Sequence, residues 1–577
     1  MNKNLNKQNI IEIIHDNKFL KNSLEICNAM NHYFSTCVVE NQNIPLRYST
    51  HFLSQNTPTS FFLSDIEDME IITCVKNMKN SHSCGHDDIS SFIIKNTISA
   101  IIQPLNHIFN LSFKSGIFPD HFKISKIIPL LKDGDPKLAS NYRPISLLPS
   151  ISKILERLMF KRLSNYLDSL KFFNESQYGF RRNRSTELAL LDITEFVLNG
   201  MENKLTTVGV FLDLSKAFDS VNHDILLKKL NSIGIRGLQY NWFESYLKCR
   251  HQYVSIGSNT SAYTPIKCGV PQGSILSPLL FLIFMNDISN VSKIIRTVLF
   301  ADDTTFLCSG KNIKEVTNTI NSKLIKIYDW LASNSLNINY KKTNYMLFGP
   351  KIVTNTLNTK IFINNTPLER VPITKFLGFM LCDNLSWLDH ILYTSTKITK
   401  LTGILFKLRY KLTADIVKKI YYSLIYPYLT YGIIIWGNSA KSHLDHLNLA
   451  YNYFIRCLFV LKKSEHITEF YKKGNLLKIS QIYRLYSSKF MYKVNQKIMP
   501  QFVQNNFQKN THRYLDLRFN RDFKTPLTRL QIFKSSIFCE GVSIWNDLNK
   551  ELKLINNIKL FMKLLKDLIF NESIELK

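Results

Sequence analysis

The pattern of hydrophobic and polar positions divides the chain into a helical beginning, a mixed middle and a helical end. Residues 1–60 are polar with scattered apolar positions, which is typical of one or two amphipathic helices, and helical periodicity dominates from 64 to about 170. Short β-branched and aromatic runs between 207 and 307 predict strands, whereas the pattern from 395 onward is helical, basic and rich in tyrosine. The sequence therefore predicts an α+β protein with helical material on both flanks.

The middle of the chain gives the most specific expectations. The apolar run TVGVFLDL at 207–214 predicts a strand, and Ser277 as N-cap with Pro278 in the first helical position predicts the start of a buried helix. The runs on both sides of Asp302 and Asp303 predict a β-hairpin with these acids at its tip. Further along we expect one helix followed by three strands: 312–332, 338–348, 360–363 and 373–381.

Composition and charge narrow the range of functions. A chain of 577 residues is too long for one hydrophobic core, and a hydrophobic content of 45% excludes a disordered protein. The 73 Lys and Arg residues against 44 Asp and Glu residues give a formal net charge of +29, which favours a polyanionic partner such as nucleic acid. Because the sequence has neither an apolar signal segment nor an apolar run of the roughly 20 residues that a membrane helix needs, we expect an intracellular protein.

Three acids stand out in this basic chain. Asp213 ends the strand predicted at 207–214, and Asp302 and Asp303 lie at the tip of the predicted hairpin. Taken alone, Asp213 is explained as a helix N-cap and the acid pair as ordinary solvated turn residues. Taken together, they can lie on neighbouring strands, where three carboxylates repel each other unless cations such as Mg²⁺ compensate. The combination therefore indicates two-metal phosphoryl transfer.

The segments that contain these acids resemble the palm motifs of reverse transcriptases. Motifs A, B and C are matched in order by FLDLSKAFDSV, GVPQGSILSPLLF and FADD, at 211–221, 269–281 and 300–303. Flanking segments match as well: IIPLLKDGD followed by NYRPISLL (127–148), QYGFRRNRST (177–186), LNINYKKT (336–343), FLGF (376–379), YGIIIWG (431–437) and SIWNDLN (543–549). In detail, the chain is similar to the non-LTR (LINE-type), jockey-like retrotransposons from about residue 60 nearly to its end.

This resemblance implies an RNA-directed DNA polymerase whose partners are an RNA template, a DNA primer or target and dNTPs, and by family analogy a nuclear protein. It also implies a right-hand architecture with fingers, a palm built from an antiparallel sheet with helices, and a helical thumb. We expect these divisions: an N-terminal helical extension (1–60), fingers with the start of the palm (61–206), the palm (207–385), the thumb (386–460) and a basic helical C-terminal extension (461–577).

The resemblance assigns the catalytic acids residue by residue. Asp213 and Asp302 match the ligands of two Mg²⁺ ions, for which Mn²⁺ is an expected substitute, and Asp303 matches the supporting second acid of motif C. Phe218 matches the aromatic gate that excludes a ribose 2′-hydroxyl; its alternative role is that of a core aromatic. Gln272 and Gly273 match the motif B residues that shape the nucleotide pocket, where glycine lets the backbone approach the substrate closely.

Several cations are also assigned by the resemblance. Arg143, and with less support Lys132, match fingers residues that hold the triphosphate, because a guanidinium fork suits phosphate oxygens. Without the motif around them, both are explained as solvated surface charges. Lys342 matches the motif D lysine that donates a proton to the leaving pyrophosphate, although Lys341 fits the same position.

Two further segments belong to the expected nucleic-acid path. Arg181 is assigned to the template, with Arg182 and Arg184 as equal alternatives. The FLGF segment at 376–379 matches the primer-grip hairpin, and it is equally explained as a core strand.

The resemblance leaves other functions open. Because only about 60 residues precede it, we expect a copy without the endonuclease that such elements usually carry. The alternative function is a catalytically silent, nucleic-acid-binding remnant of the element. An RNA-templated RNA polymerase is disfavoured by Phe218 and by Ala301 before the acid pair, where such enzymes tend to have a polar residue and a glycine.

Overall fold

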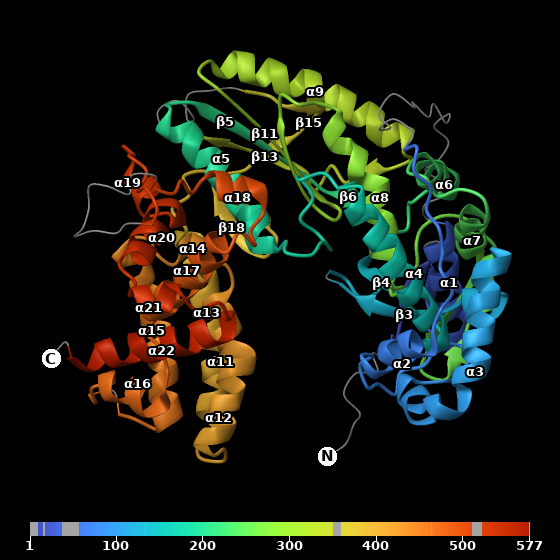
Figure 1. The fold of residues 1–577 in the computed structure, drawn as a ribbon, viewed down its shortest axis with the longest axis horizontal. Coiled ribbons are helices and arrows are strands. Elements are labelled where there is room, and N and C mark those ends of the chain that lie inside the picture. The colour runs from blue at the N-terminus through green and yellow to red at the C-terminus, as the bar shows by residue number, and fades with distance from the viewer. Residues whose placement is uncertain are drawn as a thin grey trace.

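The computed structural model describes residues 10–15, 18–36, 57–132, 134–349, 359–462, 464–510 and 522–575. The described chain forms an arch, in which a central sheet at the top joins two limbs that are mainly helical (Figure 1). One limb contains the N-terminal third of the chain and the other contains the C-terminal third. The expectation of an α+β protein with helical flanks is therefore confirmed.

The central sheet has five strands in the order β10-β11-β5-β13-β16. All neighbours are antiparallel except β13 and β16. Their bounds are Arg296–Phe300, Asp303–Gly310, Thr206–Leu212, Asn344–Phe348 and Glu369–Arg370.

Both faces of the central sheet are covered, which explains why β5 is buried along its whole length. Val208 and Val210 point into a core that they share with α9 (Ile313–Ser333), whereas Phe211 points into a second core that includes α5 (Thr186–Glu202). Successive strand residues alternate between faces, so a strand between two helical layers is buried at every position and is mostly apolar.

The N-terminal limb contains a second five-stranded sheet in the order β4-β3-β7-β8, with β9 beside β7. These strands are Tyr142–Leu147, Ile124–Leu131, Arg250–Ile256, Asn259–Thr260 and Thr264–Ile266. The limb's helices are α1 (Ser23–Thr36), α2 (Asp68–Lys76), α3 (Ser91–Ser115), α4 (Ser150–Ser169), α6 (His223–Ser232), α7 (Leu238–Leu247) and α8 (Ser277–Met285), which is apolar after Ser277. A small ribbon, β1 (Ile13–His15) with β2 (Lys18–Leu20), precedes α1, so the described part of residues 1–60 is not only helical.

Two strands that the sequence predicted as continuous are each divided by a turn. The strand expected at 338–348 is split into β12 (Asn337–Ile338), which pairs with β6 (Leu214–Ser215), and β13. The strand expected at 373–381 is a hairpin of β17 (Ile373–Phe376) and β18 (Phe379–Cys382). Here Leu377 and Gly378 both have positive φ, which no extended strand accommodates. The short strand expected at 360–363 is limited to β14 (Phe362–Ile363), which pairs with β15 (Thr366–Pro367).

From residue 388 onward, every regular element of the described chain is a helix. The longer helices of this C-terminal limb are α11 (Leu388–Leu408), α15 (Lys441–Phe459), α17 (Ile479–Asn495), α20 (Ile537–Asn546) and α22 (Ile558–Glu575). The shorter ones are α12 (Ala414–Ile420), a π-helix (Tyr421–Ile425), α13 (Tyr426–Thr430), α14 (Ile433–Trp436), α16 (Thr468–Gly474), α18 (Gln501–Asn505), α19 (Gln531–Lys534) and α21 (Lys550–Lys553). One hydrophobic core runs from α5 through α11, α15 and α17 to α20 and α22, so this limb is packed continuously with the central sheet.

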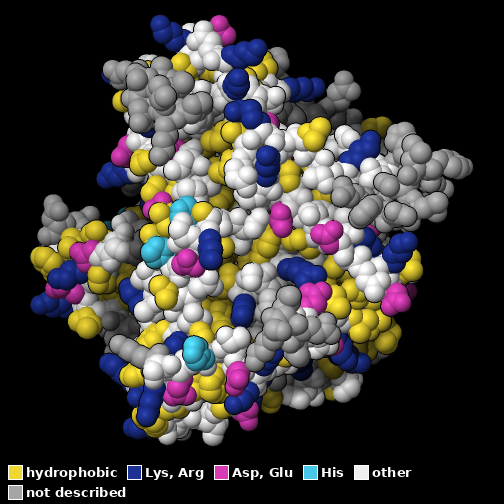
Figure 2. All heavy atoms as spheres, turned by 90° about the vertical axis from the view of Figure 1, so that its left-hand side faces the viewer, with side chains coloured by type: hydrophobic (Ala, Val, Ile, Leu, Met, Phe, Trp, Pro, Cys, Tyr) yellow, Lys and Arg dark blue, Asp and Glu magenta, His cyan; other side chains and the backbone are white. Residues whose placement is uncertain are grey.

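The surface of the C-terminal limb carries charges of both signs. On the face that Figure 2 shows, Lys and Arg side chains are interspersed with Asp, Glu and hydrophobic side chains over the described part. Within the described residues, no helix combines the length and hydrophobicity that crossing a bilayer requires.

Candidate active site

The register of the central sheet brings the three acids together. Strand β11 pairs with β5 so that Thr304 lies opposite Leu212, and Asp213 and Asp303 are the next residues on the two strands. Asp302 lies in the two-residue turn between β10 and β11, where Phe300 pairs with Asp303. The predicted hairpin with acids at its tip is confirmed, and the strand that ends in Asp213 is its neighbour.

A glycine beside the hairpin explains part of the QYGF motif. Gln177 forms a parallel bridge with Leu299, and its side-chain Oε1 accepts a hydrogen bond from the Ala301 amide at 3.2 Å. A Cβ atom on Gly179 would lie 2.4 Å from the Ala301 nitrogen, so a larger residue would displace the turn. The segment before α5 therefore supports the turn that carries Asp302.

Asp213 is held from the other side by the turn that divides the strand expected at 338–348. Asn339 Nδ2 donates to Asp213 Oδ2 at 2.8 Å, and the Asn339 amide donates to the Asp213 carbonyl at 2.9 Å. The Asp213 amide donates to Thr343 Oγ1 at 3.2 Å. Asn339 was not predicted as a site residue, although it lies within the LNINYKKT segment.

Burial and mutual repulsion raise the pKa values of the hairpin acids. Burial raises the pKa of Asp303 to about 6, and the charges of Asp302 and Asp213 act in the same direction. The pKa of Asp302 is raised by burial first and by Asp213 next, while the positive charges of Lys132 and Arg143 oppose the increase. The site thus concentrates negative charge that a nearby cation would relieve.

The donor set fits hard divalent cations. Carboxylate oxygens are the ligands that Mg²⁺ prefers, and Mg²⁺ usually takes one or two protein carboxylates and completes its shell with water and phosphate oxygens. Asp213 and Asp302 are such a pair. Within the described ranges, no group of three or more His, Cys, Asp or Glu residues is arranged to hold an ion by itself.

The motif B loop lies between the motif A turn and strand β4. The Ser146 amide donates to the Gln272 carbonyl at 2.9 Å, and Gly273 has a φ of +145°. A Cβ atom on Gly273 would lie 2.2 Å from the Ser146 carbonyl oxygen, so the glycine is required for this close approach.

The Phe218 side chain is partly buried in the motif A turn. Its ring stacks on Phe281 of α8 with the ring centroids 4.3 Å apart, and Phe180 approaches it edge-on at 6.5 Å. The ring thus has a packing role in the core beside α8, and it is still partly accessible to solvent.

The predicted triphosphate and proton-donor cations are exposed. Lys132 directly follows β3, and Arg143 lies on the neighbouring strand β4; the Lys132 amide donates to the Asn141 carbonyl at 2.8 Å. Lys342 and Lys341 are both exposed in the turn between β12 and β13, so the structure leaves the choice between them open.

The three arginines of the GFRRNRST segment have different surroundings. Arg181 donates to the Asn174 carbonyl at 2.7 Å and lies over the Phe173 ring, so it is partly used within its own loop. Arg184 pairs with Glu175 and lies over the Tyr178 ring at 5.2 Å. Arg182 is the most exposed of the three.

The FLGF segment is both a hairpin turn and a part of the core. Tyr431 donates from its hydroxyl to the Leu377 carbonyl at 2.6 Å, and its ring stacks on Phe379 with a centroid distance of 4.6 Å. A Cβ on Gly432 would lie 2.2 Å from the Phe379 ring. The YGIIIWG segment of the C-terminal limb therefore supports this hairpin, a contact that the motif match could not reveal.

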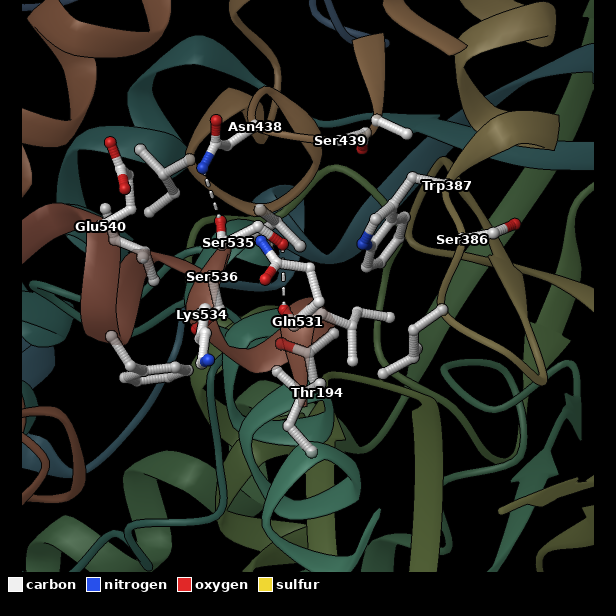
Figure 3. A pocket seen from close by; sticks show the side chains of 18 of the residues that line it. Thr194, Ser386, Trp387, Asn438, Ser439, Gln531, Lys534, Ser535, Ser536 and Glu540 are labelled. Atoms are coloured by element: carbon white, nitrogen blue, oxygen red, sulfur yellow. Dashed lines mark hydrogen bonds between the residues drawn. The ribbon is translucent and has the colours of Figure 1, made fainter. Parts of the chain in front are cut away.

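Two cavities differ in their relation to this site. A cavity of about 510 Å³ lies between α5, α14, α19, α20 and the start of α15, where the Asn438 side chain donates to the Ser535 carbonyl at 3.0 Å (Figure 3). None of the predicted site residues lines it. A cavity of about 40 Å³ adjoins the site, and its walls include Ser146, Asp219 and Gln272.

Comparison with known proteins gives a consistent result. Residues 131–381 match the family described as reverse transcriptase (RNA-dependent DNA polymerase). The chain is 30% identical over 415 residues to the RNA-directed DNA polymerase from mobile element jockey of Drosophila melanogaster, covering 70% of this chain and 45% of that protein. It is 28% identical to the probable RNA-directed DNA polymerases from transposon BS (67% of this chain, 44% of that protein) and transposon X-element (70% and 45%) of the same species. The chain thus spans less than half the length of these relatives.

Proposed function

Because the chain belongs to the reverse transcriptases of non-LTR, jockey-like retrotransposons, we propose that it is an RNA-directed DNA polymerase that extends a primer 3′-hydroxyl with dNTPs. The observation that carries this proposal is the register of β5 and β11, which places Asp213 beside the hairpin acids Asp302 and Asp303. The arrangement joins two motifs that lie far apart in the sequence, and a phosphoryl-transfer site needs such a group of oxygen ligands.

Asp213 and Asp302 would hold two Mg²⁺ ions, with Mn²⁺ as a substitute, and Asp303 would support them. When bound, such ions stabilise the attacking and leaving oxygens of an in-line displacement. Asn339 fixes the orientation of the Asp213 carboxylate through its 2.8 Å hydrogen bond. The pKa values of Asp302 and Asp303 are raised, and bound cations would lower them by neutralising the carboxylate charges.

The residues around the acids would bind and select the nucleotide. Arg143 and Lys132 would hold the triphosphate, since their charges already act on Asp302. Lys342 would donate a proton to the leaving pyrophosphate.

The pocket itself would be formed by the motif A turn and the motif B loop. Phe218 would exclude a 2′-hydroxyl from the sugar position. Gln272 and Gly273 would form the wall against which the nucleotide lies. The close approach of Gly273 to Ser146 supports this placement, because the glycine has no side chain that would take up space in the pocket.

The two limbs would hold template and primer. Residues 61–206 would form the fingers and the start of the palm, 207–385 the palm, 386–460 the thumb and 461–577 a C-terminal extension, with 1–60 as an N-terminal extension. Arg181, in the loop beside the acid turn, would contact the template, and the β17–β18 turn would contact the primer. The arch in which both limbs flank the central sheet supports this right-hand arrangement (Figure 1).

Primer extension on an RNA template tests the proposal. We expect extension by the wild type with Mg²⁺ and a loss of at least about a thousandfold in Asp302→Asn, since the amide removes a metal-binding charge. Asp329→Asn changes an exposed acid on α9 and serves as the matched control with unchanged activity.

The alternative, a silent nucleic-acid-binding remnant, predicts a different result. The net charge of +29 would then give binding that weakens steeply with salt. Extension by the wild type would be no greater than by Asp302→Asn with either metal, and that outcome would overturn the polymerase proposal.

A further inference from the structure

The motif A turn and the motif B loop are joined by a hydrogen bond that the motif matches do not assign. Gln272 Nε2 donates to both carboxylate oxygens of Asp219, at 2.8 and 2.9 Å. A carboxylate only accepts hydrogen bonds, so this contact selects one of the two amide orientations of Gln272. Its Oε1 atom must then point away from Asp219.

The backbone on the Asp219 side is fixed independently of this contact. The Asp219 amide donates to the Lys216 carbonyl at 2.9 Å, and the Val270 amide donates to the Phe218 carbonyl at 2.9 Å. Gly269 has a φ of +86°, and a Cβ atom there would lie 2.6 Å from the Asp219 carbonyl oxygen. The two loops therefore pack backbone against backbone.

The backbone on the Gln272 side is fixed as well. The buried carboxylate of Glu156 on α4 accepts hydrogen bonds from Ser274 Oγ at 2.8 Å and from the Ile275 amide at 2.7 Å. The Ser146 amide holds the Gln272 carbonyl. Removal of the Asp219 carboxylate should therefore release the Gln272 side chain while the loop itself keeps its position.

The carboxylate of Asp219 is retained at an energetic cost. Burial raises its pKa to about 6, against the opposing effects of the Gln272 hydrogen bonds and the charge of Lys216. Lys216 is itself engaged by the N-terminal helix α1, since it donates to the Tyr33 hydroxyl at 2.7 Å. The two hydrogen bonds from Gln272 offset part of this cost, which links the presence of the carboxylate to the orientation of the Gln272 amide.

We propose that Asp219 is a positioning residue of the polymerase reaction, which fixes the Gln272 amide so that Oε1 faces the incoming nucleotide. The pocket then offers a hydrogen-bond acceptor at this wall, and it favours a nucleotide group that donates, such as a sugar hydroxyl. This inference rests on the proposed function, because it takes Gln272 as part of the nucleotide pocket. It adds Asp219, which contacts Gln272 and acts through it.

Nucleotide binding in the absence of chemistry tests the proposal. The full chain is bound to an RNA template with a 3′-deoxy-terminated DNA primer, and the affinity for the next complementary dNTP is measured for wild type, Asp219→Leu and Asp219→Asn. We expect about a tenfold loss of dNTP affinity in Asp219→Leu, because the amide is no longer oriented. Asp219→Asn should stay within about threefold, since its Oδ1 still accepts one hydrogen bond from Gln272.

Two controls separate positioning from a general structural role. Affinity for the template–primer and the thermal midpoint should be the same in Asp219→Leu as in the wild type. In steady state, Asp219→Leu should raise the KM for dNTP more than it lowers kcat. Equal dNTP affinity in Asp219→Leu and wild type would overturn the inference, and so would a parallel loss of template–primer affinity.

The outcomes for the inference and for the proposed function are distinguishable. If the wild type binds dNTP with the expected Asp219 dependence but does not extend an unblocked primer, the polymerase proposal fails and the role of Asp219 holds. If it extends the primer and Asp219→Leu binds dNTP normally, the role of Asp219 fails alone. A wild type that neither binds dNTP nor extends a primer contradicts both.

Discussion

The acid edge of the central sheet and the C-terminal limb are stabilised in opposite ways. At the edge, burial and then the charge of neighbouring carboxylates raise the pKa values of Asp302 and Asp303, and polar contacts such as the Asn339 hydrogen bond hold Asp213. In the limb, large aromatic side chains such as Trp436, Tyr451 and Trp545 are fully buried in one continuous core. The clustered charges at the edge lower the stability of the fold. The buried core of the limb provides the stability that compensates for this loss.

Because of this difference, we expect substitutions at the acid edge to lower activity and substitutions in the limb to lower stability. The largest expected effect on stability is in the limb. Trp545→Ala should lower the free energy of unfolding by about 3–5 kcal/mol, because it leaves a cavity in the shared core and removes the hydrogen bond from Nε1 to Asp522 at 2.9 Å. Urea denaturation measures the change. Leu554→Ala, at a side chain that is 78% exposed, is the control and should change stability by less than about 0.5 kcal/mol.

A similar stability for Trp545→Ala and wild type would contradict the view that the limb shares one core with the central sheet.

Phe218 lies in the proposed nucleotide site and also packs against the core, so its substitution should affect both activity and stability. Phe218→Ala removes the proposed gate and also the stack on Phe281. We expect the preference for dNTP over rNTP, measured as the ratio of kcat/KM values, to fall by about 10- to 200-fold. Stability should fall by less than in Trp545→Ala, because the Phe218 ring is only partly buried. An unchanged preference together with a large loss of stability would make Phe218 a core residue alone.

Tyr431 connects the limb with the site, and its hydroxyl offers a smaller test. Tyr431→Phe keeps the stack on Phe379 and removes the 2.6 Å hydrogen bond to the Leu377 carbonyl. We expect a loss of about 1 kcal/mol in stability and about a fivefold lower affinity for the primer–template. Tyr422→Phe, at an exposed position of the same limb, should leave both quantities unchanged. Unaltered primer–template affinity in Tyr431→Phe would show that the hairpin does not depend on this contact.

The smallest expected effect is a pH dependence of nucleotide binding. The pKa of Asp219 is about 6, so the carboxylate is charged above this pH and gains a proton below it. Protonation removes acceptor capacity for Gln272, so the KM for dNTP of the wild type should rise about threefold between pH 7.5 and pH 5.5. His223, which contacts the Gly269 carbonyl, has a lowered pKa because it is buried.

Asp219→Asn provides the reference for this pH dependence, because its side chain does not titrate. The ratio of wild-type to Asp219→Asn KM values should change with pH, which removes the contribution of other titrating groups. Because the folded-state pKa of Asp219 lies above the usual value, its protonation also favours the folded state as the pH falls through 6. A constant ratio would contradict the assigned pKa effect.

The two regions also differ in how far the sequence could predict them. At the acid edge, particular residues at particular spacings are required, so the strand before Asp213 and the hairpin with Asp302 and Asp303 were predicted correctly. The contacts of Asn339 and Asp219 were missed, because a side-chain hydrogen bond depends on where two loops meet. The prediction of one strand at 338–348 was wrong for the same reason. The turn at Asn339 binds Asp213, and this contact cannot be predicted from the pattern of apolar residues.

In the limb, the sequence could predict helices but not their arrangement. Many different packings satisfy the same helical pattern of buried aromatics, so periodicity alone could not place α17 and α20 against α5. The contact between Tyr431 and the FLGF turn was likewise hidden, although both segments belong to recognised motifs. Local pattern identifies elements, whereas the partners of each element follow from the whole fold.

Strands β5 and β11 bring acids from two distant motifs to one edge of the sheet, and we propose that these acids act as one catalytic unit. Single-turnover primer extension by Asp213→Asn, Asp302→Asn and the double variant tests it most directly. We predict that each single variant loses at least about a thousandfold in rate and that the double variant is within a few-fold of the slower single variant, because groups that act as one unit are not additive. Losses that multiply in the double variant, or a single variant that extends like the wild type, would contradict the claim.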